Sequence, residues 1–207
     1  MLQRPSSCEL CKGHFLHYGF CPDWYPKNPK LAFLCEAPGA DEVDQGEPLI
    51  GPTGKMTFNR FVRPLGYGRN DVLAANTIRC RPPENMYPTG ALAVHMRSKC
   101  RQYDDVHGQD LKAGGILTWN PNLFIITEHP ACLFRTPAMT RYVEKHIERA
   151  FDLAKQGFRV CVVMGNQAMQ VVCPELKGGI RAWHGHIWEG KWPGKDEAPK
   201  KGFAKLF

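Results

Sequence analysis

The hydrophobic positions along the chain fall into short apolar runs separated by helical patterns. The runs without polar alternation lie at 31–35, 72–78, 123–127 and 159–164. Such runs are typical of parallel strands that are covered on both faces. Apolar residues recur at helical spacing over 55–65 and 142–155, which predicts helices between the strands. The pattern predicts an α/β fold: a single-domain, three-layer α/β/α arrangement with a central four-stranded, mostly parallel sheet.

Polar residues follow these runs at the ends where a parallel sheet binds its ligands. The first run ends in an acidic, Gly- and Pro-rich segment from Glu36 to Gly54, which predicts a site loop. Asn76 is polar within an apolar run, and His129 follows another run and precedes a proline. Either side chain could instead be structural, Asn76 as a hydrogen-bonded core amide and His129 as a packed imidazole.

Charge and the C-terminal region favour a polyanionic partner without proving one. The chain has 27 Lys and Arg against 20 Asp and Glu, a net charge of +7 and a pI near 9.0. Residues 178–192 combine Arg181 with histidines and tryptophans, which suits an exposed loop on nucleic acid or, equally, a turn packed by tryptophans. We expect 191–207 to be a flexible basic tail. No apolar run is long enough to span a bilayer, so we expect a cytoplasmic, soluble protein.

The nine cysteines argue for a metal site in a reducing compartment. Cys8 and Cys11 form a Cys-x-x-Cys pair, and Cys80 and Cys100 complete a set of four thiolates. This spacing suits an iron-sulfur cluster or a zinc site equally well. His14, His17 and Cys21 offer the pair a local zinc site instead.

Taken together, these segments resemble the uracil-DNA glycosylase superfamily, and most closely its iron-sulfur branch, family 4. Residues 36–39, with 46–51 and Gly54, look like the first motif of that family. Residues 76–85 match its Asn-x-x-x-Cys-Arg-Pro-Pro-x-Asn signature. Residues 129–135 are similar to its His-Pro-Ala-Tyr-Leu-Leu-Arg motif, and 164–168 to its Leu-Gly-x-x-Ala turn. The resemblance runs from Cys8 to about Trp188.

The resemblance implies a DNA glycosylase that hydrolyses the N-glycosidic bond of deoxyuridine in base excision repair. It implies a 4Fe-4S cluster on Cys8, Cys11, Cys80 and Cys100, held partly by an N-terminal segment 1–30 of a domain 1–190. The implied catalytic residues are Glu36, Glu42 and His129. The implied base-binding residues are Ala37, Gly39, Leu49 and Asn76, and the implied DNA contacts are Gly51, Arg81, Asn85, Arg135 and Arg181. We expect a monomer that acts on single- or double-stranded DNA, with a replication or repair protein as a candidate partner.

Three departures from the family pattern keep other functions open. Leu49 stands where the family has an aromatic residue that stacks on the base, and Cys35 stands where it has glycine. The Leu-Gly-x-x-Ala strand also follows the His-Pro strand, although sheet position need not follow chain order. The alternatives are a catalytically weak or inactive superfamily member that acts as an iron-sulfur DNA-binding or replication accessory module, a glycosylase for a modified pyrimidine, and a zinc protein unrelated to DNA.

Overall fold

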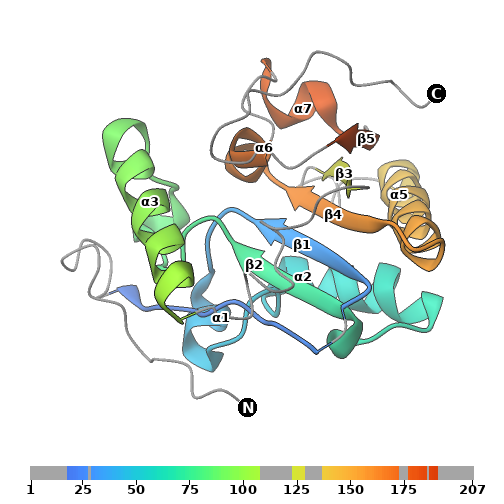
Figure 1. The fold of residues 1–207 in the computed structure, drawn as a ribbon, viewed down its shortest axis with the longest axis horizontal. Helices are drawn as coiled ribbons and strands as arrows, with labels where there is room; N and C mark the ends of the chain where they lie inside the picture. The colour runs from blue at the N-terminus through green and yellow to red at the C-terminus, as the bar shows by residue number, and fades with distance from the viewer. Residues whose placement is uncertain are drawn as a thin grey trace.

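The structure, a computed structural model, describes residues 18–27, 29–107, 123–128, 137–172, 177–185 and 187–190. Five strands form one sheet in the order β2-β1-β4-β3-β5 (Figure 1). They are β1 (Leu31–Cys35), β2 (Val72–Asn76), β3 (Leu123–Glu128), β4 (Arg159–Met164) and β5 (Ile187–Gly190). The first four pair in parallel, and β5 pairs antiparallel with β3.

The predicted α/β fold with a mostly parallel sheet is confirmed, but the sheet has five strands where four were predicted. The additional strand, β5, belongs to the region 178–192 that we expected to be an exposed loop or turn. Its residues pair with β3 from Leu123↔Gly190 to Ile126↔Ile187. Pairing across the sheet edge therefore turns a short, Trp-containing segment into a strand.

Sheet position does not follow chain order. β4 lies between β1 and β3, although it follows β3 in the sequence. The register Leu34↔Val163 joins β4 to β1, and Glu128↔Met164 joins β3 to β4. The ends of β1, β3 and β4 are consequently brought to one edge of the sheet.

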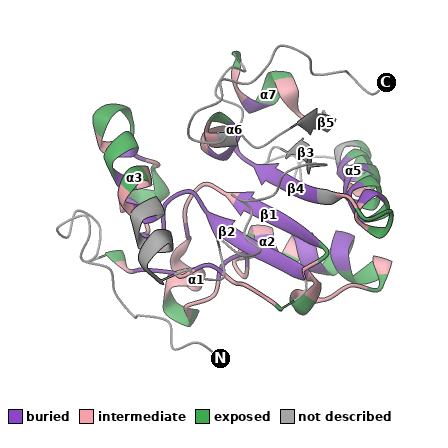
Figure 2. Ribbon diagram, in the orientation of Figure 1, coloured by how far each residue is buried: buried purple, intermediate pink, exposed green. Residues whose placement is uncertain are grey.

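Alternating residues of β1 enter two apolar clusters, one on each face of the sheet. Leu31 and Phe33 pack with α5 (Pro137–Lys155) and η2 (Thr57–Val62), a π-helical segment. Ala32 and Leu34 pack with α6 (Asn166–Val172) and α7 (Gly179–Trp183). β1 and β2 are buried over most of their length (Figure 2), as the absence of polar alternation predicts.

The remaining helical segments lie between β1 and β2 in the sequence or follow β2. α1 (Ala40–Gln45) forms within the predicted site loop, and α2 (Pro52–Met56) follows it. The single helix predicted over 55–65 is divided among α2, η2 and the 3-10 helix η3 (Arg63–Leu65). The other elements are η4 (Arg69–Asp71), η5 (Pro83–Asn85) and the long helix α3 (Gly90–His107), which stands beside β2 in Figure 1.

The segment 20–24 runs antiparallel along the outer edge of β2. Trp24 forms a bridge with Ala74, and Phe20 forms one with Cys80 just beyond the strand. The described N-terminal residues are thus fixed to the sheet by backbone hydrogen bonds. Within the described part of the chain, no helix has the length and apolar character needed to cross a membrane.

Candidate active site

A pocket of about 390 Å³ opens where the carboxyl ends of β1 and β4 meet the site loop. This is the edge at which open α/β sheets bind their ligands. The pocket contains seven residues expected from the sequence: Glu36, Ala37, Gly39, Glu42, Leu49, Gly51 and Asn85. Its other lining residues are Cys35, Ala40, Asp41, Pro52, Thr53, Gly54 and Met164.

Glu36 follows β1 and lies against the turn after β4. Its Oε1 accepts the Gln167 N–H at 2.8 Å. Gly165 has φ +99°, and a Cβ there would lie 2.6 Å from the Glu36 carboxyl carbon, so this turn needs glycine for two reasons. Burial raises the pKa of Glu36, while the N–H groups of Gln167 and Asn166 oppose that rise. The carboxyl is therefore both held in place and poised to carry a proton more readily than an exposed glutamate.

Glu42 on α1 organises the site loop through both of its carboxylate oxygens. Oε2 accepts the Gly39 N–H at 2.7 Å, and Oε1 accepts the Leu49 N–H. Burial raises the pKa of Glu42, and hydrogen bonds from Gly39, Leu49 and Ile50 oppose it. The side chain thus joins Gly39 and Leu49, two parts of the loop that both line the pocket.

Leu49 adopts a left-handed backbone conformation, with φ +61°, although it is not glycine. Such a conformation costs about 1–3 kcal/mol and persists only where the surroundings enforce it. Two contacts do so: the Glu42 carboxylate accepts its N–H, and its carbonyl packs directly against Gly54. The side chain is 4% exposed and belongs to the same apolar cluster as Phe58 and Met164.

Arg69 bonds to two consecutive residues of the site loop. Its Nε pairs with Glu47 at 2.8 Å, and its Nη2 donates to the Pro48 carbonyl. The guanidinium lies 5.2 Å from the Trp24 ring and 5.3 Å from the Phe58 ring. These distances suit cation-π contacts, so a charged group is accommodated beside the core.

Asn76 ends β2 and is 4% exposed. Neither its side-chain nitrogen nor its side-chain oxygen has a hydrogen-bond partner among the described residues. It does not line the pocket itself, but it is in register with Cys35, which does. A buried amide without partners costs about 1–3 kcal/mol, which makes a bound ligand the natural partner.

Cys35 contributes a neutral thiol to the pocket. Burial, followed by the charges of Glu42 and Glu36, raises its pKa well above the ordinary value for a thiol. A nucleophilic cysteine needs the opposite shift. We therefore interpret Cys35 as part of the pocket wall.

The predicted DNA contacts divide into two places. Arg81 donates from Nε to Asn85 Oδ1 at 3.0 Å, which links the signature segment to the pocket. Asn85 has φ +57°, one of two consecutive positive values with Glu84. Arg181 is exposed on α7 and does not line the pocket.

Cys80 and Cys100 are buried and pack in one apolar cluster with Phe20, Ile78 and Met96. The backbone N–H of Arg79 points to the Cys100 sulfur at 3.4 Å. Hydrogen bonds of this kind stabilise cluster-bound thiolates, so the two cysteines fit a metal-thiolate centre. Among the described residues no group of three or more His, Cys, Asp or Glu side chains could hold a metal. Further ligands would come from Cys8 and Cys11, which lie outside the described residues.

His129 and Arg135 also lie outside the described residues. The structure describes the strand that leads to His129, and its last residue, Glu128, is in register with the pocket residue Met164.

Asp23, Arg69 and Arg79 were not expected from the sequence. The side-chain contacts of Asp23 with Asn76 and Arg79 span 53 and 56 residues, so no local pattern could indicate them. One indication for Arg69 and Arg79 was present in the sequence, because both flank the apolar run 72–78. A charged residue next to a buried strand needs a partner if it is itself buried.

Comparison with known proteins agrees with this geometry. A model of the uracil DNA glycosylase superfamily matches residues 22–198. The type-4 uracil-DNA glycosylase of Archaeoglobus fulgidus is 36% identical over 83 residues, 40% of this chain and 41% of that protein. That of Thermotoga maritima is 31% identical over 87 residues, 42% and 45% of the two chains. That of Pyrobaculum aerophilum is 26% identical over 176 residues, 70% and 88%. The chain thus spans about two fifths of the length of the first of these relatives.

Proposed function

The chain belongs to the uracil DNA glycosylase superfamily, and from that premise we propose that it hydrolyses the N-glycosidic bond of deoxyuridine in intracellular DNA. The observation that carries the proposal is the buried amide of Asn76, unpartnered among the described residues, beside a pocket lined by two half-buried carboxyls. An amide offers a donor and an acceptor side by side, as the imide edge of uracil does. A base with that edge would satisfy both atoms.

The proposed reaction separates the roles of the two glutamates. A base inside a duplex must be extruded before it reaches the pocket. Cleavage leaves positive charge on the sugar and negative charge on the departing base. Glu36 would orient the attacking water, because its side chain lines the pocket and is held in place by the turn after β4. Glu42 would hold the loop, because both of its oxygens accept backbone N–H groups.

His129 would donate to the base as negative charge develops on its O2. Support comes from the strand register, which brings the residue before it to the level of Met164 in the pocket. A donor fixed where charge develops is worth about 10²–10³ in rate. Ala37, Gly39 and Leu49 would contact the base, and the DNA backbone would meet Gly51, Arg81, Asn85, Arg135 and Arg181.

The first test is release of uracil from single-stranded and duplex oligonucleotides that contain one deoxyuridine, with protein purified without oxygen. We expect release by the wild-type protein and its loss in His129→Ala. Arg60→Ala, which removes one member of a partly exposed ion pair with Glu144, is a matched control and should keep the activity. No release from a folded, DNA-binding wild-type protein would contradict the proposal and favour a non-catalytic module.

A second candidate is a glycosylase for a modified pyrimidine, and the observation that favours it is the placement of Leu49. Its side chain is buried with Phe58 and Met164, so the pocket wall there is aliphatic. An aliphatic wall offers less stacking than an aromatic ring. Turnover on a panel of 5-substituted pyrimidines separates the two candidates, since the second requires faster release of a substituted base than of uracil.

We also propose that Cys8, Cys11, Cys80 and Cys100 hold a 4Fe-4S cluster, with segment 1–30 as its N-terminal arm. The cluster would order the chain around it. Support comes from the shared burial of Cys80 and Cys100 and from the N–H directed at the Cys100 sulfur. Iron and zinc counted in Cys100→Ala and in the buried sheet cysteine variant Cys161→Ala test the assignment. Loss of iron in the first variant alone is expected, and full iron in both, or zinc in place of iron, would contradict it.

The remaining organisation is likewise proposed. The glycosylase domain would be monomeric and cover 1–190, and 191–207 would be a basic tail, although the family match extends to residue 198. A replication or repair protein remains a candidate partner. Sedimentation of the full chain with and without DNA would test the monomer.

A further inference from the structure

A buried ion pair lies between the Cys80/Cys100 cluster and the end of β2. Asp23 is 5% exposed and Arg79 is 4% exposed, and Arg79 Nη2 pairs with Asp23 Oδ2. The two residues come from different segments, Asp23 from the strip along the β2 edge and Arg79 from the residues after β2. Neither residue lines the pocket.

The Asp23 carboxylate also bonds to the backbone of Asn76. Asp23 Oδ1 accepts the backbone N–H of Asn76 at 3.1 Å. β2 is an edge strand, and the strip 20–24 supplies backbone partners at Ala74 and at Arg79. At Asn76, between these two points, a carboxylate takes the place of a backbone carbonyl. The position of Asn76 thus depends on a side chain from a distant part of the sequence.

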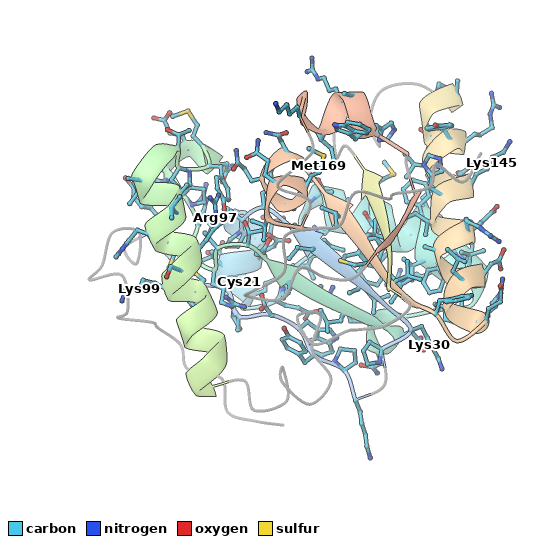
Figure 3. All side chains as sticks on the ribbon, turned by 45° about the horizontal axis from the view of Figure 1, so that its top comes forward. Cys21, Lys30, Arg97, Lys99, Lys145 and Met169 are labelled. Carbon is cyan, nitrogen blue, oxygen red and sulfur yellow. The ribbon has the colours of Figure 1, made fainter. Side chains whose placement is uncertain are left out.

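Arg79 also bonds to Cys100, a residue of α3. Arg79 Nη1 donates to the Cys100 carbonyl at 3.1 Å, and the Arg79 N–H points to the Cys100 sulfur at 3.4 Å. Figure 3 shows α3 beside the body of the molecule, with Arg97 on its inner side. Asp23 and Arg79 together therefore connect α3, which carries Cys100, to the end of β2, which carries the Asn76 amide.

A buried ion pair is weak support for stability, because desolvation offsets most of the attraction between the charges. Apolar side chains of similar size would fill the same space without that cost. What they could not supply is the directed acceptor for Asn76 and the directed donor for Cys100. The contacts therefore favour a role in positioning.

We propose that Asp23 and Arg79 are positioning residues that hold Asn76 in register for the base and couple it to the α3 segment around Cys100. This inference rests on the proposed function insofar as the ligand is a uracil-like base. The link between Asn76 and Cys100 is independent of the identity of that base.

The test uses a double variant, Asp23→Leu with Arg79→Met, which removes both charges together and leaves no buried charge unpaired. Asp23→Asn is the conservative variant, because its amide oxygen can still accept the Asn76 N–H. Glu144→Gln, which breaks the ion pair with Arg60 between α5 and η2, is the matched control. Thermal unfolding establishes that each variant is folded at the assay temperature.

The first readout is base discrimination in the absence of chemistry. The probe is an oligonucleotide that contains one 2′-deoxypseudouridine, whose C-glycosidic bond is not hydrolysed, compared with the same oligonucleotide containing thymidine. Discrimination is the dissociation constant for the thymidine oligonucleotide divided by that for the deoxypseudouridine oligonucleotide. We expect this ratio to fall about tenfold or more in the double variant, to fall less in Asp23→Asn and to stay unchanged in Glu144→Gln. A folded double variant with wild-type discrimination would overturn the proposal.

The second readout does not depend on the base. Hydrogen exchange of the Asn76 backbone amide is expected to accelerate in the double variant more than that of Ala74, whose N–H bonds to the Trp24 carbonyl. Equal acceleration at both amides would indicate a purely structural role and would overturn the proposal. If the wild-type protein neither releases uracil nor discriminates between the probes, the proposed function fails, and the exchange experiment still decides whether Asp23 holds Asn76.

Discussion

Three polar side chains in or beside the pocket, two half-buried and one buried, differ in how their hydrogen bonds are satisfied. Both oxygens of Glu42 accept backbone N–H groups, the Glu36 carboxylate accepts the N–H groups of Gln167 and Asn166, and the Asn76 amide has no partner among the described residues. A polar side chain with all its hydrogen bonds made can be explained by its role in the fold, whereas a buried polar side chain without hydrogen bonds adds nothing to stability. At the residue scale, this difference supports a structural role for Glu42 in the loop and the proposed role of Asn76 in binding the base.

The orphaned amide predicts a conflict between stability and activity at Asn76. Asn76→Leu keeps a similar volume and removes two unsatisfied polar atoms, so we expect the free energy of unfolding to rise by about 1 kcal/mol. We expect uracil release to fall by about 10² or more, because the base loses its edge contacts. Urea unfolding and single-turnover kinetics measure the two effects. A variant that is destabilised and still active would show that the amide serves the fold.

Glu36 predicts a pH dependence of stability. Burial raises its pKa in the folded state, so between the unfolded and folded values the folded protein binds more protons than the unfolded chain. The free energy of unfolding is therefore highest below the unfolded-state pKa and falls as the pH rises through the folded-state pKa. Glu36→Gln keeps an acceptor for the Gln167 N–H but does not ionise. We expect it to flatten this part of the stability profile.

Urea unfolding at a series of pH values, with Glu148→Gln as an exposed control on α5, checks this expectation. The control should reproduce the wild-type slope. Because Glu42 is shifted in the same direction, Glu36→Gln should reduce the slope without abolishing it. A slope unchanged in Glu36→Gln would mean that Glu36 titrates alike in the folded and unfolded chains.

Some site residues were predictable because they follow apolar runs, and others were not. Glu36 and Asn76 come directly at the ends of recognisable strands, and the sheet geometry then brings them together. Asp23 follows no run and acts through contacts more than fifty residues away. The left-handed conformation of Leu49 was equally hidden, since it depends on Glu42 and Gly54 and not on the leucine itself.

At the scale of elements, the site loop is a compact structure. α1 forms inside it with Gly39 at its start and Gly46, at φ +65°, at its end, and Glu42 bonds to the backbone on both sides. The Gly54 backbone at α2 packs against the Leu49 carbonyl. The chain therefore holds a polar, Gly-rich segment in one conformation through a few specific contacts.

The close packing at Gly54 predicts that a single methyl group disrupts the loop. A Cβ at Gly54 would overlap the Leu49 carbonyl, whereas a Cβ at Gly51 would meet no atom within 4 Å. We expect Gly54→Ala to lower the free energy of unfolding by about 1–3 kcal/mol and Gly51→Ala to change it little. Thermal and urea unfolding of the two variants provide the comparison. Equal stability would show that the loop shifts freely around Gly54.

The elements that sequence predicted are those with strong apolar patterns. β1 and β4 were predicted with the observed bounds because both faces of these strands are covered. α1 was missed because only Val43 among its six residues is strongly apolar, and β5 because four residues are too few for a periodic signal. Both form through contacts with distant parts of the chain, the loop backbone in one case and β3 in the other.

At the scale of the whole molecule, the fold brings separate sequence motifs to one edge of the sheet. Residues after β1, β2 and β4 meet there, although β3 and the two long helices α3 and α5 separate β4 from the first two strands in the sequence. The order β2-β1-β4-β3-β5 was not predictable from local patterns, because apolar runs do not encode their neighbours. The resemblance to a known family indicated which segments belong together. The strand pairing shows how they come together although their order along the chain is rearranged.

The net charge of +7 gives the molecule a general attraction for DNA, but specific binding also depends on where single cations lie. Arg81 bonds to Asn85, so its guanidinium lies beside a residue of the pocket lining. Arg60 is instead paired with Glu144 between η2 and α5. These two arginines therefore separate a local phosphate contact from the overall charge, since either substitution lowers the net charge by one.

We expect Arg81→Ala to weaken DNA binding similarly for all sequences and to reduce the slope of log K against log salt by about 1, because one phosphate contact releases about one counterion. Arg60→Ala should change the slope by much less. Fluorescence anisotropy over a range of salt concentrations measures both slopes on the same oligonucleotide. Equal slopes for the two variants would mean that the DNA responds to net charge alone, and Arg81 would then lie outside the DNA footprint.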